Sequence, residues 1–279
     1  MQTRKKLMKS MTKFFWQICF IIAIIIVIYP ILFALGNSFK SDSEAYLTMH
    51  NFIPKNFNLF NYNFIFESLP MLKIMMNTFL ISSVVTIIRL TLALFAGYAI
   101  VYLKFKGKKI YMGLINLTLF LPFTVMMIPN FLTLSSMGLI DSIIGVMLPM
   151  FFSATGVFMI VQNMKTIPKS LIEVARLDRI SDFKIMKEII LPLIKPQLIA
   201  SSVWFFTGTW NEYIWPRLIL KSTDNYTLSL ALRMFMAGEG GQGFTSVMAM
   251  SVITMIIPLI VYLIFQKYII DTFTSSGIK

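Results

Sequence analysis

Six long apolar runs constrain the fold of this chain more than any other feature. A transmembrane helix needs roughly 20 apolar residues. Of the 279 residues, 57% are hydrophobic, and the mean hydropathy is +0.77. Lipid offers no hydrogen-bond partners to a backbone, and no run alternates as a strand or barrel hairpin would. The sequence therefore predicts an all-α, polytopic membrane protein with six transmembrane helices. These cover residues 14–35, 75–103, 110–132, 143–162, 198–219 and 247–265.

The runs also predict a division of the chain. The first apolar run is too long for a signal-peptide core of roughly 7–15 residues, so we expect it to be retained. Residues 1–40 then form a cytoplasmic tail and the first helix, and residues 41–73 an external loop. Residues 74–268 form the transmembrane domain, with a charged loop at 165–196, and residues 269–279 a cytoplasmic tail.

The positions of Lys and Arg predict the orientation. With both termini on one side, that side collects 18 of these residues and the other side collects 6, with Arg89 inside the second run. Cytoplasmic loops carry the excess of positive charge, so both termini and the 165–196 loop are predicted to be cytoplasmic. The net charge of +13 therefore reflects membrane orientation, and no nucleic-acid partner is expected.

The loop from Ile167 to Pro196 is the only long amphipathic segment. Pro168, Ser170 and Glu173 resemble the start of a helix whose apolar residues alternate with charges. A second short helix is expected after it, capped by Ser181 or Asp182 and interrupted by Pro192. The helical pattern alone fits both a solvated connector and a docking segment for another protein.

Fixed offsets within this loop resemble a known family. Glu173, Ala175, Ile189, Leu191 and Pro192 match the EAA loop of the membrane subunits of binding-protein-dependent ABC importers. Val174 departs mildly from the usual Ala. Arg179 replaces a Gly, which bears on the turn between the two helices because only Gly adopts positive φ freely.

The resemblance extends over nearly the whole chain. The chain is similar to the carbohydrate-uptake branch of that family, and within it to the MalG-like permease with a MetI-like fold. The segments that carry this similarity are YPILFALGNSFK at 29–40, AGYA at 96–99, FKGK at 105–108, WNEYIWP at 210–216 and QKY at 266–268.

The family implies an ATP-driven importer of a sugar or oligosaccharide that works by alternating access. This chain would be one permease of a heterodimer in the cytoplasmic membrane, together with two ATPase subunits and an extracytoplasmic solute-binding protein. ATP and Mg would bind to the ATPases, because this chain has no phosphate-binding G-x-x-x-x-G-K-[ST] motif. The chain itself is not expected to be an enzyme or to bind a cofactor. The residues implied in ATPase coupling are Glu173, Val174, Ala175, Asp178, Arg179, Ile189, Leu191 and Pro192, with Arg176 as a further charge at the rim.

Two groups of residues are candidates for the solute path. Arg89 lies deep in a predicted span, where an arginine costs roughly 2.5–3.5 kcal/mol, so it should face the bundle. It then either has a structural role, paired with backbone carbonyls or with the other permease, or lines the solute path. The second group fits either an aromatic belt at the membrane surface or contacts with a sugar or the binding protein. Its members are Trp210, Asn211, Glu212, Tyr213 and Trp215.

Other classes of function are less well supported. A secondary transporter or channel that acts without an ATPase is the alternative, but such proteins usually keep ionisable residues in the membrane and show internal repeats. One cysteine, Cys19, and one histidine, His50, make a metal site unexpected. The glycine-rich segment AGEGGQGF at 237–244 is expected to be an external turn.

Overall fold

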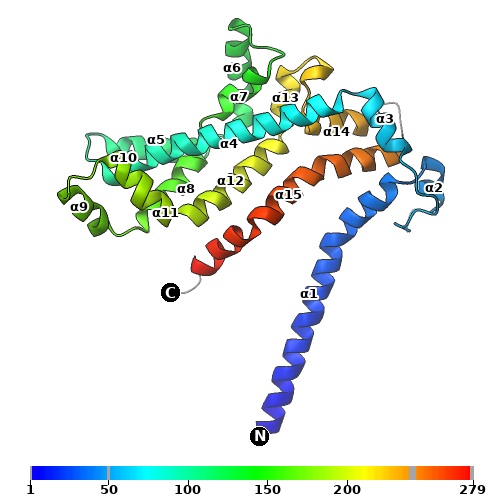
Figure 1. The fold of residues 1–279 in the computed structure, drawn as a ribbon, viewed down its shortest axis with the longest axis horizontal. Coiled ribbons are helices and arrows are strands. Elements are labelled where there is room, and N and C mark those ends of the chain that lie inside the picture. The colour runs from blue at the N-terminus through cyan, green and yellow to red at the C-terminus, as the bar shows by residue number, and fades with distance from the viewer. Residues whose placement is uncertain (1, 49–50, 239–242, 277–279) are drawn as a thin grey trace. The chain divides into compact units, whose positions relative to one another are not determined.

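The computed structural model describes residues 2–48, 51–238 and 243–276, with side chains from residue 11 to residue 272 apart from the two gaps. His50 and residues 239–242 of the glycine-rich turn lie outside this part. Within the described residues every regular element is helical (Figure 1). The all-α prediction is confirmed.

The chain divides into two compact units. The first comprises Met1–Leu69 and Leu232–Met255, and the second comprises Pro70–Ala231 and Ile256–Lys279.

The first unit joins a long helix to a small polar core. It contains α1 (Gln2–Ser38), α2 (Asp42–Leu47) and α3 (Phe60–Ser68). The Lys40 side chain is completely buried, and its amine donates to the carbonyl and hydroxyl of Thr48 and to the carbonyl of Asn51. Asn61 donates to the carbonyls of Ser38 and Lys40. The predicted external loop is therefore folded, because these bonds satisfy its buried polar groups.

The second unit is built around α4 (Met71–Tyr102), which packs against α8 and α12. Figure 1 shows α9 and α10 beside the C-terminal end of α4. The other elements in chain order are α5 (Lys108–Thr118), α6 (Phe123–Ser136), α7 (Ile143–Met147), η1 (Leu148–Met150), α8 (Ala154–Lys165), α9 (Lys169–Leu177), α10 (Asp182–Ile185), the π-helical turn η2 (Met186–Ile190), α11 (Leu191–Leu193), α12 (Lys195–Trp210), α13 (Ile214–Ile219) and η3 (Thr223–Asn225). Two further helices, α14 (Leu228–Met236) and α15 (Phe244–Ser276), cross the division between the units.

Within the described ranges, three helices are long and apolar enough to cross a membrane: Met11–Ser38, Met71–Tyr102 and Phe244–Thr272. They coincide with the first, second and sixth predicted spans. The remaining candidates are pairs of helices bent by 98° (α5 with α6), 46° (α7 and η1 with α8) and 81° (Asp182–Leu193 with Lys195–Ile219). The described residues thus contain up to six spans if each bent pair counts as one.

Proline and serine explain two of the breaks. Pro122 precedes α6 in an extended conformation, which ends the helical path from α5. Ser153 caps α8, and its hydroxyl accepts from the Gly156 N–H at 3.2 Å. Pro129 instead lies inside α6, so of these two prolines only Pro122 coincides with a break.

Gly97, in the AGYA segment, permits close packing between α4 and α8. A Cβ added there would lie 2.9 Å from the Ile160 Cγ2 and 3.4 Å from the Met164 sulfur. These side chains are fully buried. A larger residue would therefore force the two helices apart.

We expect Gly97→Val to lower the free energy of unfolding by about 1–3 kcal/mol, because it overpacks this contact. The measurement is thermal unfolding of the purified protein in detergent. Gly113→Val is the matched control, because a Cβ at Gly113 meets nothing within 4 Å. Equal stability of the two variants would contradict the close approach.

Candidate functional site

The first helix of the 165–196 loop starts differently from the sequence prediction. α9 begins at Lys169, with Pro168 as its N-cap residue and no side-chain cap. Ser170 lies inside the helix, and Glu173 is beyond the first turn. The expected hydroxyl before the helix is wrong, because the helix already begins at Lys169, and the Pro168 carbonyl accepts from the Leu171 N–H at 3.2 Å instead.

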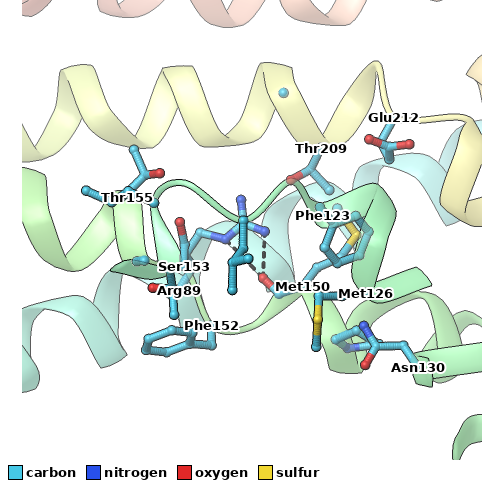
Figure 2. Close-up of a pocket in the computed structure, with 16 residues that line it drawn as sticks. Arg89, Phe123, Met126, Asn130, Met150, Phe152, Ser153, Thr155, Thr209 and Glu212 are labelled. Carbon is cyan, nitrogen blue, oxygen red and sulfur yellow. Dashed lines mark hydrogen bonds between the residues drawn. The ribbon is translucent and has the colours of Figure 1, made fainter. Parts of the chain in front are cut away.

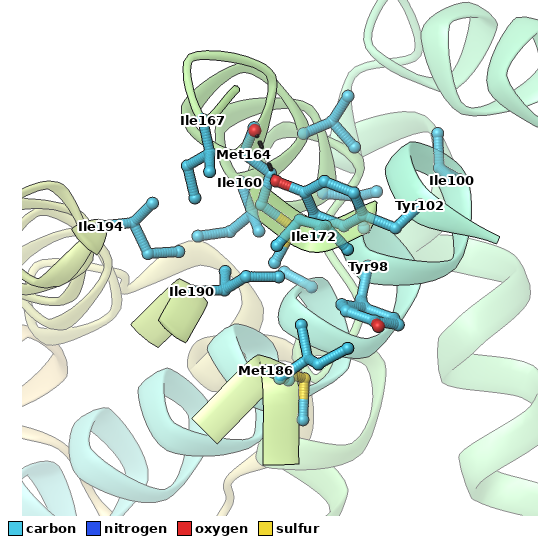
Figure 3. Packing of buried hydrophobic residues seen from close by; sticks show 14 of the residues in the cluster. Tyr98, Ile100, Tyr102, Ile160, Met164, Ile167, Ile172, Met186, Ile190 and Ile194 are labelled. Carbon is cyan, nitrogen blue, oxygen red and sulfur yellow. Dashed lines mark hydrogen bonds between the residues drawn. The ribbon is translucent and has the colours of Figure 1, made fainter. Parts of the chain in front are cut away.

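The two faces of α9 have different surroundings. Ile172 and Ala175 are buried, at 2% and 5% exposure, within an apolar cluster from α4, α8 and residues 167–194 (Figure 3). We call it the coupling-loop cluster. Leu171, Val174 and Leu177 are exposed on the outer face, with Leu177 at 82%, and we call these three the outer strip. Ala175 packs against other residues of this chain. Glu173, Asp178 and Arg179 are exposed.

Arg179 adopts the backbone conformation that the family's glycine would supply. Its φ is 57°, in the left-handed region. The Arg179 N–H donates to the Arg176 carbonyl and the Ile180 N–H to the Ala175 carbonyl, at 3.0 and 3.1 Å. These two bonds define a Schellman motif, with Arg179 at the position where glycine is usual. Ile180 packs against the coupling-loop cluster. The turn therefore keeps its shape despite the substitution.

Arg179→Gly should stabilise this turn by about 0.5–1 kcal/mol. It removes the cost of the left-handed conformation, roughly 1–2 kcal/mol, and this gain exceeds the loss from the greater entropy of glycine in the unfolded chain. Amide exchange of residues 175–181, followed by mass spectrometry, measures the change. Exchange should slow in Arg179→Gly. It should stay unchanged in Arg179→Ala, which removes the charge and keeps the backbone strain. Slowing in both variants would show that the charge matters and the backbone strain does not.

The second helix continues through Pro192, contrary to the prediction that proline interrupts it. α10 leads into the π-helical turn η2, where the Leu191 N–H donates to the Met186 carbonyl five residues earlier. This wider turn precedes the proline, which has no N–H and would clash with a normal α-helical carbonyl. The helix breaks instead at Ile194. Ile190 is buried, Ile189 and Leu191 are half-buried, and Pro192 is exposed.

A polar link ties this loop to α4. The Asp182 Oδ1 accepts from the Tyr98 hydroxyl at 2.5 Å and from the Arg176 guanidinium at 2.9 and 3.2 Å. Arg176 also donates to the Tyr102 carbonyl. Bonds from Tyr98 and then Arg176 lower the pKa of Asp182 below its ordinary 3.8. Because this pKa is lowered, the link contributes fully above pH 3.8, and its contribution is lost as the pH falls through the lower pKa of the folded protein.

Tyr98→Phe should loosen α9 and α10, because it removes the hydroxyl and keeps the ring. We expect amide exchange in residues 169–190 to accelerate about two- to fivefold, which corresponds to a net hydrogen bond of about 0.5–1 kcal/mol. Tyr111→Phe, at an exposed position in α5, is the control. Unchanged exchange in Tyr98→Phe would show that the link holds nothing in place.

The second candidate site is a cavity around Arg89 within the second unit (Figure 2). Its volume is about 580 Å³, and a neighbouring cavity of about 370 Å³ shares Arg89, Ser153, Thr155 and Gly208 with it. Arg89 Nε and Nη2 both donate to the Met150 carbonyl, at 3.0 and 2.6 Å, and the guanidinium lies over the Phe205 ring. The two interpretations of Arg89 are therefore compatible, since it binds a backbone carbonyl and also lines a cavity.

The aromatic group at 210–215 divides between core and cavity. Trp210 and Trp215 are buried, and the Trp215 indole N–H donates to the Val146 carbonyl at 3.0 Å. Neither tryptophan lines the cavities, whereas Asn211 lines the smaller and Glu212 the larger. The Glu212 carboxylate accepts from the backbone N–H groups of Ile214 and Trp215. Tyr213 lies outside both cavities.

Sequence reasoning missed three kinds of residue here. Tyr98 and Asp182 are 84 positions apart, so no local pattern connects them. Ser153, Thr155 and Thr209 line the cavity, but isolated hydroxyls in apolar helices carry no signal.

Asp141, whose φ is 58°, is the third kind of residue that sequence reasoning missed. Its carboxylate accepts hydrogen bonds from Ser222, from the N–H of Lys221 and from Asn225, and these bonds hold its pKa well below the usual range.

The described residues contain no group of three or more His, Cys, Asp or Glu side chains placed to hold a metal ion.

Known proteins resemble this chain in sequence and in fold. A permease protein of the sn-glycerol-3-phosphate transport system, UgpE, from Yersinia pestis bv. Antiqua is 30% identical over 94% of this chain and 96% of its own length. UgpE from Escherichia coli O6:H1 is 29% identical over 92% and 94%. A solved chain of a bacterial ABC transporter for import of the acidic polysaccharide alginate matches with a TM-score of 0.79, at 22% identity, over 93% and 96%.

These helices, with bent pairs in the membrane and a packed loop at one end of α4, define an importer permease of the MetI-like fold. The model of the binding-protein-dependent transport system inner membrane component family matches residues 89–274. The chain belongs to this family. It is a permease of a binding-protein-dependent, sugar-type importer, as predicted.

Proposed function

We propose that this permease is driven by an ATPase that docks on the outer strip of α9. The observation that carries the proposal is an exposed apolar strip on a helix whose opposite face is firmly packed. Leu171, Val174 and Leu177 are spaced as the anchors of a helix that lies in a groove. Exposed Glu173, Asp178 and Arg179 border the strip and fix the register of docking.

Motion at this strip reaches the membrane helices through two connections. The coupling-loop cluster unites α9 and α10 with α4 and α8, and the link between Tyr98, Asp182 and Arg176 adds a polar tie. Ile172, Ile185 and Ile190 are buried, and together contribute roughly 4–9 kcal/mol. A displacement of α9 is therefore transmitted to α4, as alternating access requires.

The assembly that fits this mechanism has four further chains. They are a second permease, two ATPase subunits that bind ATP and Mg, and an extracytoplasmic binding protein. The excess of Lys and Arg supports a cytoplasmic location of α9, α10 and both termini. The chain itself catalyses no reaction in this scheme.

The transported solute is proposed to be a sugar or a related polyhydroxylated compound. The named solutes of the relatives, a glycerol phosphate and a polysaccharide, both carry hydroxyl groups. The cavity around Arg89 offers hydroxyl and amide groups from Thr118, Asn130, Ser153 and Thr155, which are suited to such a solute. A secondary transporter without an ATPase would leave the outer strip without a role.

Leu177→Asp should prevent the ATPase from docking without unfolding the permease, because the side chain is exposed. We expect at least a tenfold loss of ATPase retained on the purified permease pair, and a matching loss of ATP-dependent uptake in proteoliposomes. Lys106→Asp, exposed in the loop between α4 and α5, should retain the ATPase. Uptake that persists in Leu177→Asp, or without any ATPase, would favour the secondary transporter.

A further inference from the structure

We propose that the two cavities around Arg89 form an anion subsite, which binds the phosphate or carboxylate group of an acidic sugar or polyol derivative. The inference rests on the proposed function, since it assigns a chemical class to the transported solute. The site is built by α4, by the break between α5 and α6, by η1 with the start of α8, and by the end of α12, all within the second unit.

Arg89 supplies the positive charge. Among the described residues it is the only cationic one that lines either cavity. The Met150 carbonyl occupies Nε and Nη2, and the Phe205 ring lies 5.1 Å from the guanidinium carbon. Nη1 makes no hydrogen bond within the described part of the chain. The guanidinium is therefore fixed in place while one nitrogen remains available to a ligand.

The start of α8 supplies further donors at the same place. Ser153, Ala154 and Thr155 line the larger cavity. The Ser153 hydroxyl caps the Gly156 N–H, whereas the backbone N–H groups of Ala154 and Thr155 have no partner among the described residues. Free N–H groups at a helix start attract anions. This 12-residue helix and Arg89 therefore favour the same kind of ligand.

Thr209 gives an independent indication of a polar ligand. It lines the larger cavity at 6% exposure, and its Oγ1 is buried without a hydrogen-bond partner. Thr207 on the same helix bonds back to the Val203 carbonyl, so an unpaired threonine hydroxyl is not a general property of α12. A buried hydroxyl without a partner is costly unless a ligand or water satisfies it.

Glu212 is the one acidic residue in the described part of the chain that lines the cavities. Figure 2 shows its carboxylate toward the end of the cavity away from Ser153 and Thr155. One of its oxygens already accepts from two backbone N–H groups. Its charge is therefore partly compensated there, and the neighbourhood of Arg89 remains favourable for an anion.

Gly208 provides a position to test the subsite without disturbing the fold. It lines both cavities, and a Cβ there would meet nothing within 4 Å. Gly208→Cys in a Cys19→Ala background places a single thiol of this chain in the cavity. The experiment measures modification rates of that thiol, in the assembled importer, by an anionic and by a cationic methanethiosulfonate.

We expect Arg89→Gln to lower the ratio of the anionic to the cationic rate by about tenfold, and Arg89→Lys to restore most of it. Ser136→Cys, exposed at the end of α6 and outside both cavities, should show no change in its ratio. A ratio at Gly208→Cys that does not respond to Arg89→Gln would overturn the proposal.

Protection by added solutes then identifies the ligand. sn-Glycerol 3-phosphate or glucuronate should slow modification of the thiol, and glycerol should not. Protection by only one of the two acids distinguishes a phosphate site from a carboxylate site. Thr209→Val should weaken this protection several-fold. Equal protection by glycerol, or protection by neither acid, would refute the subsite. Labelling needs no ATP hydrolysis, so it stays informative even if the ATPase does not dock on α9.

Discussion

The apolar packing between α9, α10 and the ends of α4 and α8 is the interaction on which the rest of this permease depends. Without it, the loop would be a flexible connector, and no force applied to it would reach the membrane helices. Ile172, Ile185 and Ile190 occupy the interior of the coupling-loop cluster. The bond from the Tyr102 hydroxyl to the Met164 carbonyl joins α4 to α8 at the same end (Figure 3). Packing fixes the position of the loop, and the polar link to Asp182 fixes its orientation.

A second constraint comes from the breaks within the candidate spans. Each break frees backbone groups that lipid cannot satisfy. The Met150 carbonyl is met by Arg89, the Val146 carbonyl by the Trp215 indole, and the N–H groups at the start of α13 by Glu212. This explains why a charged and aromatic segment stands at the end of α12. Its buried members support the broken helices, and only Asn211 and Glu212 reach the cavities.

Much of the fold was predictable because apolar length and charge distribution are local signals. The apolar runs locate α1, α4 and α15, although α1 begins at Gln2 and α15 ends at Ser276, well outside the runs 14–35 and 247–265. The amphipathic loop was located from its helical spacing. The bends were not predictable in angle, since they depend on which side chains satisfy the freed backbone. Pro192 misled the prediction because a wider helical turn accommodates it. Tyr98 and Asp182 meet only through tertiary packing, so their pairing left no trace in the sequence.

Arg89 is bonded to a carbonyl at the joint between η1 and α8. Its positive charge is therefore attached to two elements at once: covalently to α4 and through hydrogen bonds to the bend in the fourth candidate span. If the angle at this bend alters during the transport cycle, the guanidinium must either follow Met150 or release it. In both cases the electrostatic potential of the cavity changes together with its shape, so opening a passage and altering its attraction for a charged solute become a single event.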